Sequence, residues 1–113
     1  SALYRVMDEW ELSYDDTVAL TGLSTDVLKK LPDAFPKEGI SPMVAQRIET
    51  LIHLNNMLEL CYTPDEKGVW MNSTHHVFDN KSPLNYILAH PFPMDAANQV
   101  RQYLEHLAYG GFW

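Results

Sequence analysis

The sequence is short of cysteine, of basic residues and of long apolar runs, and each shortage excludes a class of protein. One cysteine, Cys61, cannot form an internal disulfide, so the chain suits a reducing compartment and must be held by its core. No apolar run reaches the roughly 20 residues that a membrane-spanning helix needs. The chain also opens without a signal-peptide pattern. We therefore expect a cytoplasmic protein with no membrane partner.

Basic side chains are outnumbered, since fifteen Asp and Glu face eight Lys and Arg and give a net charge of −7. Tight, non-specific binding to nucleic acid depends on Lys and Arg that neutralise phosphates, so this balance opposes it. The charge instead favours a basic protein as partner.

Motifs of catalysis and metal binding are also missing. The sequence has no P-loop and no nucleophile elbow, and Gly110-Gly111 comes where no helix follows to hold an anion. His75, His76 and Asp79 share a loop, but a structural zinc site needs four ligands and the only thiol lies elsewhere. We predict no enzyme, no metal site and no cofactor, with the loop histidines making local hydrogen bonds.

Helix signals, by contrast, run through the whole chain, and no strand candidate exceeds a few residues. Ser41-Pro42 and Ser82-Pro83 each combine a capping hydroxyl with a proline at the first helical position. The first pair begins the longest helix, expected to run to about Tyr62 between the N-terminal and C-terminal parts. We predict an all-α fold, a compact bundle of five to seven helices. Positions expected to face its core include Ala19, Met43, Leu104 and Leu107.

The segment after Ser13 has the shape of a helix-turn-helix, in which a short helix ends at Gly22 and a second is capped by Ser24. Its candidate DNA-binding residues are Ser24, Thr25, Lys29 and Lys30. The second helix offers no Arg or Gln for a bidentate contact to a base. It is therefore poorly equipped to read a sequence.

The last third of the chain has a specific pattern. It contains Trp70-Met71, a polar loop, Ser82-Pro83-Leu84 with Ile87-Leu88, and a final helix with Val100, Leu104, Leu107 and Gly110. This order resembles the toxin-binding domain of the Xre/MbcA/ParS antitoxin family. That family shows a Trp-Leu pair, a Pro-Asn loop, a Gly-x-Ser-Pro-Leu helix start and a last helix of Val-x-x-x-Leu type ending in Gly.

Three positions depart from the family pattern. This chain has Thr74-His75 where the family has Pro-Asn, Phe78 where it has Leu, and Asn80 where it has the Gly before Ser-Pro. Asn80 is a mild change, because Asn tolerates the left-handed backbone that Gly would supply.

The resemblance implies three parts: a helix-turn-helix-like part over residues 1–40, the long central helix over 41–63, and a helical toxin-binding-like subdomain over 64–113. It also implies that the subdomain covers a toxin of the RES type, an NAD-consuming fold whose active site the chain's end can block. The implied toxin-binding residues are Lys81, Asn85, Gly110, Gly111, Phe112 and Trp113. Trp70 is assigned to the core.

The Phe112-Trp113 pair leaves two interpretations open, because large aromatic side chains are costly to expose to water. They can fold back on the protein's own core, or they can anchor in a partner, where Trp is a frequent hot-spot residue.

Our hypothesis is an antitoxin that covers the active site of a RES-type toxin, with repression of its own operon as an open second role. Its expected partners are the toxin and, less directly, operator DNA, in a homodimer or a toxin–antitoxin hetero-oligomer. The alternative is a DNA-binding transcription regulator or adaptor of the same fold without a toxin. A docking module of a larger protein is a further alternative.

Overall fold

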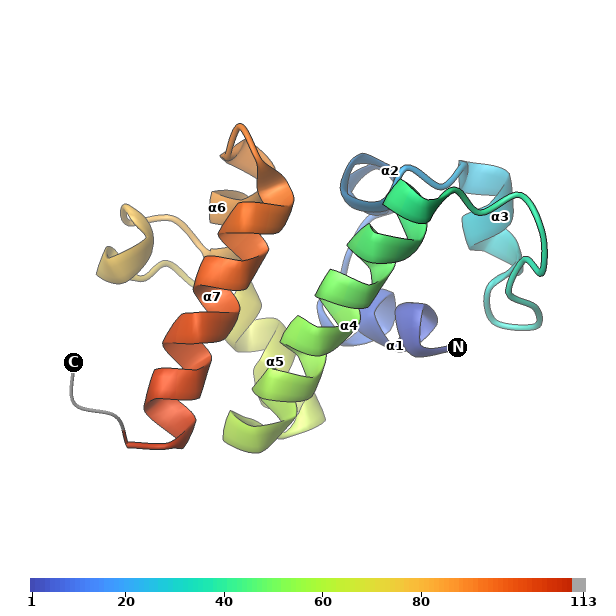
Figure 1. The fold of residues 1–113 in the computed structure, drawn as a ribbon. Helices are drawn as coiled ribbons and strands as arrows, with labels where there is room; N and C mark the ends of the chain where they lie inside the picture. The colour runs from blue at the N-terminus through green and yellow to red at the C-terminus, as the bar shows by residue number, and fades with distance from the viewer. Residues whose placement is uncertain (111–113) are drawn as a thin grey trace.

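The computed structural model describes residues 1–110, which form seven α-helices and one 3-10 turn (Figure 1). The elements are α1 (Ala2–Glu9), α2 (Tyr14–Thr21), α3 (Thr25–Lys30), α4 (Pro42–Cys61), α5 (Pro64–Met71), η1 (His76–Phe78), α6 (Pro83–Ala89) and α7 (Pro93–Ala108). The only extended pairing in this part is a single bridge between His75 and Lys81. The predicted all-α bundle is confirmed.

Serine caps begin five of the helices: Ser1 caps α1, and the sequence predicts the other four. The hydroxyl oxygen of each accepts a hydrogen bond from the backbone N–H three residues on, at 3.0–3.3 Å, in Ser13, Ser24, Ser41 and Ser82. Gly22 ends α2 with a left-handed φ of 84°, and Asn80 has the left-handed φ of 59° that its place in the pattern requires. These boundaries are settled by bonds between near neighbours in the chain.

Helix α5 begins in a charged stretch, where Asp65, Glu66 and Lys67 follow Pro64. Thr63 and Glu66 form a capping box in which the Thr63 N–H donates to the Glu66 carboxylate at 2.8 Å. Pro64 occupies the first helical position, where it needs no N–H partner. Eight helical residues follow, and they carry Trp70 on their inner face.

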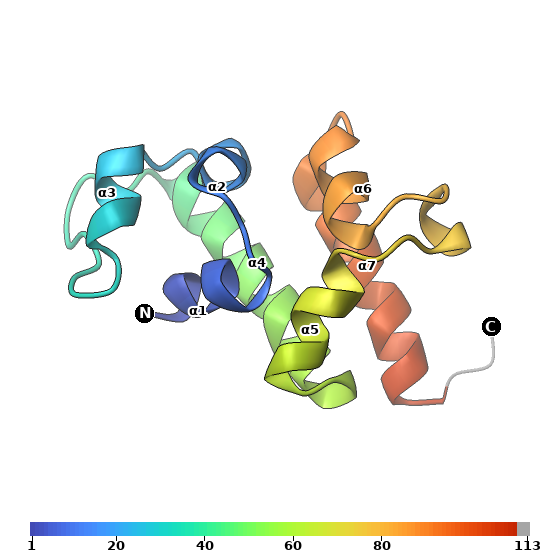
Figure 2. The same cartoon turned by 180° about the vertical axis from the view of Figure 1, so that it is seen from behind.

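Helix α4 is the central element, and it packs against α7 and against α1, α2 and α5 (Figures 1 and 2). This confirms the expected place of the long helix. The larger core cluster joins Val6 and Trp10 of the N-terminal part to Leu54, Met71 and Leu104. A smaller cluster holds α3 against α1 and α4 and comprises Leu3, Met7, Leu23, Leu28, Leu31 and Ile48.

Three positions expected in the core are exposed instead: Ala19, Met43 (57% exposed) and Leu107 (45% exposed). On α2 the buried positions are Leu20 and two threonines, Thr17 and Thr21. Each threonine hydroxyl donates to a carbonyl one turn back, at 2.8 and 2.7 Å, so its polar atom is satisfied and it can face the core.

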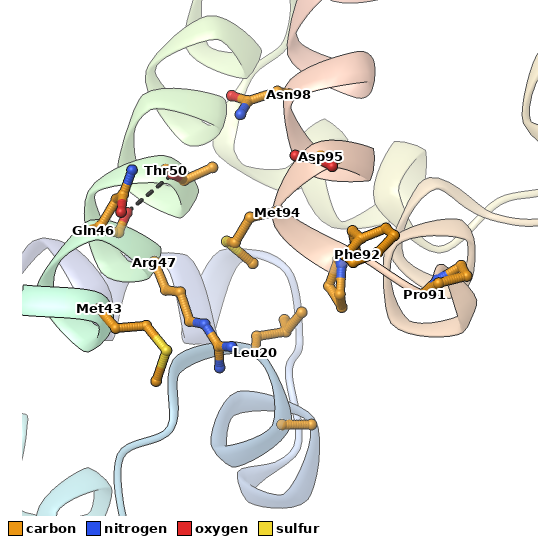
Figure 3. Close-up of a pocket in the computed structure, with 12 residues that line it drawn as sticks. Leu20, Met43, Gln46, Arg47, Thr50, Pro91, Phe92, Met94, Asp95 and Asn98 are labelled. Atoms are coloured by element: carbon orange, nitrogen blue, oxygen red, sulfur yellow. Dashed lines mark hydrogen bonds between the residues drawn. The ribbon is translucent and has the colours of Figure 1, made fainter.

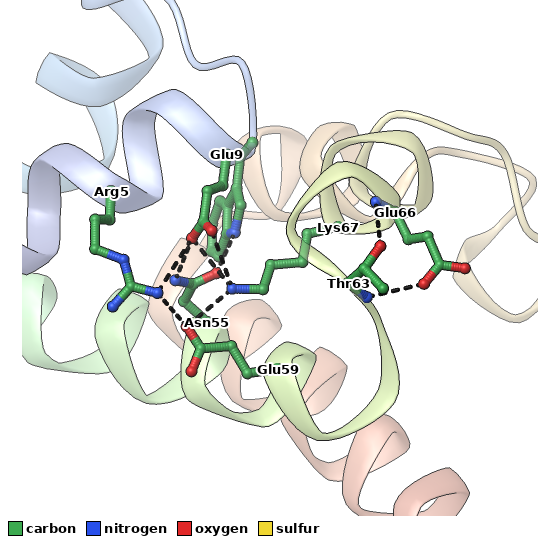
Figure 4. Close-up of polar contacts among 8 residues, drawn as sticks. Arg5, Glu9, Asn55, Glu59, Thr63, Glu66 and Lys67 are labelled. Carbon is green, nitrogen blue, oxygen red and sulfur yellow. Dashed lines mark hydrogen bonds and ion pairs between the residues drawn. The ribbon is translucent and has the colours of Figure 1, made fainter.

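A cluster of charged and polar side chains fixes α5 to the rest of the fold (Figure 4). The Lys67 ammonium is 1% exposed, and it donates to Glu9 of α1 at 3.1 and 3.3 Å and to Glu59 of α4 at 2.9 Å. Arg5 pairs with the same two carboxylates from the solvent side. With Asn55, these residues form what we call the Lys67 cluster.

Neighbouring contacts bring the end of α1 against α4 and α5. The Trp10 indole N–H donates to Asn55 at 2.9 Å, and the Asn55 amide donates to Glu9 at 3.1 Å. The Asn72 amide donates to the Trp10 carbonyl at 2.9 Å. At Gly68 an added Cβ would lie 2.7 Å from the Glu9 carbonyl, so glycine allows α5 to approach this closely.

We predict that Leu104→Ala lowers the free energy of unfolding by about 2–5 kcal/mol, because it removes a fully buried side chain and leaves a cavity. Leu107→Ala makes the same chemical change one turn later at an exposed position, and should cost less than about 1 kcal/mol. Urea denaturation of both variants measures the difference. Equal losses would contradict the assigned inner face of α7.

We also predict a pH-dependent contribution from Glu59. The hydrogen bond from Lys67, with the Lys67 and Arg5 charges, lowers the pKa of this carboxyl from its ordinary value in spite of some desolvation. A lowered folded-state pKa stabilises the fold above the ordinary pKa, and this stabilisation is lost as the pH falls through the folded-state value.

The wild type should therefore be more stable than Glu59→Gln at about pH 7, and the gap should narrow as the pH falls below the ordinary pKa of a glutamate. Glu38→Gln, at an exposed loop position, serves as the control and should track the wild type throughout. Urea denaturation across this range measures both differences. A gap between the wild type and Glu59→Gln that does not change with pH would contradict the ion-pair role.

Candidate functional site

Trp70 is the centre of the C-terminal helices. Its indole stacks on Tyr62 and Tyr103 with ring centroids 5.7 and 6.5 Å apart, and meets Phe78 edge-on at 6.0 Å. The His75 ring lies 5.1 Å away on another side. This arrangement buries Trp70 to 9% exposure and confirms its place in the core. The Phe78 side chain, at the position where the family has Leu, is buried against Tyr103.

The loop before α6 places Lys81 and Asn85 together. Its backbone is closed by the His75 N–H donating to the Lys81 carbonyl at 3.1 Å and the Lys81 N–H donating to the Phe78 carbonyl at 2.9 Å. The Ser82 cap then accepts from the Asn85 N–H, which puts Asn85 in the first turn of α6. The side chains of Lys81 and Asn85 are both exposed, so a partner can reach them.

The end of α7 carries the other predicted toxin-binding residues. Tyr109 closes the helix through its N–H to the Glu105 carbonyl at 3.0 Å, and its side chain is 75% exposed. Gly110 follows with a left-handed φ of 60° and is also exposed. Gly110 thus lies on a different element from Lys81 and Asn85. The remaining three predicted residues, Gly111, Phe112 and Trp113, lie outside the described residues.

The predicted DNA-binding residues lie on and just before α3. The hydroxyl of Ser24 is engaged as the cap of that helix, and Thr25 is partly buried. Lys29 and Lys30 occupy the last turn and expose their side chains. The exposed pair gives α3 two cations for phosphate contacts, and base reading by this helix stays a prediction.

A cleft of about 360 Å³ lies where the N-terminal helices meet the turn between α6 and α7. Figure 3 shows Met43 and Arg47 of α4 on one side, and Phe92 and Met94 at the start of α7 on the other. The Phe92 side chain is 67% exposed. We call this feature the junction cleft.

The junction cleft is suited to contact rather than to catalysis. Its apolar surface includes methionines, which adapt to partners of different shape. Arg47 makes no ion pair with any residue in the range 1–110, so its guanidinium can pair with an acidic group of a partner. Asp95 provides a negative charge on the opposite wall of the cleft. No nucleophile paired with a base lines the described cleft.

The histidine loop has no metal site in the described range, because no three His, Cys, Asp or Glu side chains there are grouped to hold an ion. The His75 Nε2 instead lies 3.2 Å from the Trp70 carbonyl, which confirms the expected local hydrogen bonding for this histidine. The Cys61 thiol lies 3.8 Å from the Leu104 carbonyl, and partial burial raises its pKa. Among residues 1–110 no helix is both long and apolar enough to cross a membrane.

Sequence reasoning missed the junction cleft and the Lys67 cluster. Pro91-Phe92-Pro93 was a usable signal for the cleft, since a phenylalanine between two prolines sits at a turn where burial is difficult. The capping-box spacing from Thr63 to Glu66 was a usable signal for α5. No local signal marks Lys67 as buried, because its partners are 58 and 8 residues away.

One comparison with known proteins finds a family match for the C-terminal part of the chain. A family model described as the antitoxin Xre/MbcA/ParS C-terminal toxin-binding domain matches residues 58–110, from the end of α4 to the residue after α7. No curated protein and no solved structure matches the chain. Residues 58–110 therefore match the C-terminal toxin-binding domain of the Xre/MbcA/ParS antitoxin family, which supports an antitoxin role with a toxin as partner.

Proposed function

We propose that this protein neutralises a RES-type toxin by covering the toxin's active site with the end of α7 and the residues that follow it. The single observation that carries the proposal is the toxin-binding family match over residues 58–110. In the antitoxins that the chain resembles, the C-terminal end blocks the toxin's active site. Tyr109 to Trp113 would have that role here.

Exposure of the end of α7 supports this assignment. Leu107 and Tyr109 are large side chains with 45% and 75% of their surface exposed, although Leu104, about one turn before Leu107, is fully buried. Exposed apolar groups gathered at one end of an element are typical of a binding surface. Lys81 and Asn85 would add polar contacts from the start of α6.

Charge supports the same partner. Toxins of the RES type resemble enzymes that bind an anionic dinucleotide in a basic pocket. A protein with a net charge of −7 would be attracted to such a pocket from a distance, which increases the association rate. The attraction would weaken as salt is added.

Operator binding is the second candidate function, and α2, the turn at Gly22 and α3 support it. Lys29 and Lys30 are the exposed cations of α3, and no Arg or Gln accompanies them on that helix. The same net charge that favours a basic toxin opposes DNA. We therefore propose toxin neutralisation as the main activity, with operator repression by a homodimer or toxin-bound assembly as an addition.

The experiment is co-expression of this chain with its toxin, scored by growth and by co-purification, beside a chain truncated after Ala108. The intact chain should rescue growth and co-purify, and the truncated chain should fail in both assays. Circular dichroism and urea denaturation of both chains check that the truncated chain is still folded.

Two point variants refine this test. Tyr109→Ala should weaken toxin binding by about 2 kcal/mol, the size of a hot-spot contact. Tyr14→Ala, at an exposed tyrosine on α2, should leave the affinity unchanged. Two results together would exclude the end of α7 from the mechanism. Tyr109→Ala and Tyr14→Ala would bind the toxin with equal affinity, and the truncated chain would still neutralise the toxin. An intact chain that neither rescues nor binds would exclude the antitoxin function, and an operator-binding assay would then test the alternative.

A further inference from the structure

The outer side of α5 carries a groove of about 370 Å³ whose surface is almost entirely apolar. Its floor is formed by Tyr62, Val69 and Trp70, and its rim by Asp65, Glu66, Ser73 and His75. All of these residues lie within the segment that matches the toxin-binding family. Helix α5 lies toward the viewer in Figure 2, between the end of α4 and the loop that leads to α6. We call this feature the α5 groove.

The floor of the α5 groove is rigid and incompletely covered. Trp70 is held by its stacking on Tyr62 and Tyr103, and by the edge-on contact with Phe78. Val69, on the outer face of the same helix, is 67% exposed. Aromatic rings that are fixed before a partner arrives lose little conformational entropy on binding, which favours affinity.

The rim carries two acidic side chains, Asp65 and Glu66, that form no ion pair with a Lys or Arg among residues 1–110. Glu66 is held in place by the capping box, in which its carboxylate accepts the Thr63 N–H at 2.8 Å, and this bond lowers its pKa. Asp65 makes no ion pair with the other described residues and is exposed. Lys67, the nearest cation in sequence, is buried on the opposite side of α5 with Glu9 and Glu59.

An aromatic and aliphatic floor beside carboxylates is suited to one kind of side chain. The methylene stem of an Arg or Lys can lie on Val69, its cationic head can rest against the Tyr62 and Trp70 rings, and the carboxylates can pair with it. An acidic group would be repelled by the rim. A purely apolar side chain would remove water from Asp65 and Glu66 without giving them a partner.

We propose that the α5 groove binds an arginine or lysine side chain of the toxin, as a second contact separate from the end of α7. This inference rests on the proposed function, since it names the toxin as the occupant. It gives the antitoxin two points of attachment: the chain's end would block the active site, and the α5 groove would hold a basic residue elsewhere on the toxin surface.

The test compares Asp65→Lys with Asp15→Lys by calorimetric titration against the toxin. Both replacements reverse one acidic side chain in the first turn of a helix, so they match in net charge and in the effect on the helix dipole. Asp65→Lys should weaken binding at least about tenfold, as expected for a charge facing a cation in an interface. Asp15→Lys should change the affinity less than about threefold, the effect of general attraction alone.

A charge-swap experiment identifies the occupant. Each surface Arg and Lys of the toxin is changed to Glu in turn and paired with Asp65→Lys, and one of these toxin variants should restore the lost affinity. Val69→Gln, which keeps the charge, should also weaken binding, because it removes apolar surface from the floor. Circular dichroism confirms that each variant is folded.

Other outcomes overturn the inference in distinguishable ways. If the wild type binds toxin and Asp65→Lys behaves like Asp15→Lys, the α5 groove is not a toxin contact, while the proposed function stands. If Asp65→Lys weakens binding and no charge swap restores it, the occupant is not a basic side chain. If Val69→Gln changes the sedimentation of the free protein and not its toxin affinity, the groove binds a second copy. If the wild type binds no toxin, the proposed function and this inference are both wrong.

Discussion

The buried ammonium of Lys67 is the constraint on which the arrangement of this protein depends. A charge removed from water is tolerated only where opposite charges and hydrogen bonds surround it, and here Glu9 and Glu59 supply them from two other helices. Helix α5 can therefore sit only where α1 and α4 already lie together. Since α5 also carries Trp70 and the α5 groove, the position of this groove depends on the contacts of that buried charge.

The toxin-binding domain is consequently completed by residues outside the family match. The match begins at residue 58, yet Glu9 reaches Lys67, and the Trp10 carbonyl accepts from Asn72. Val6 and Trp10 share the larger core cluster with Met71 and Leu104. The N-terminal helices thus act as a support for the toxin-binding helices. A partner that docks on α5, α6 or α7 meets a surface held in position from both halves of the chain.

Three surface features remain available to partners, and they differ in physical character. The end of α7 exposes large side chains after its last buried residue, Leu104. The α5 groove is aromatic with an acidic rim, and the junction cleft combines adaptable methionines with the unpaired guanidinium of Arg47. The first suits insertion into a pocket, the second a basic side chain, and the third an apolar group beside an acidic one.

The sequence by itself determined what depends on near neighbours: the caps at Ser13, Ser41 and Ser82, the left-handed turn at Asn80, the all-α class and the family of residues 58–110. Tertiary structure decided what depends on distant ones. Lys67 is buried because a carboxylate 58 residues away meets it, and Met43 and Leu107 are exposed because no other element among residues 1–110 covers those helix ends. Helix periodicity shows which side chains share a face, but only the packed neighbours decide whether that face meets protein or water.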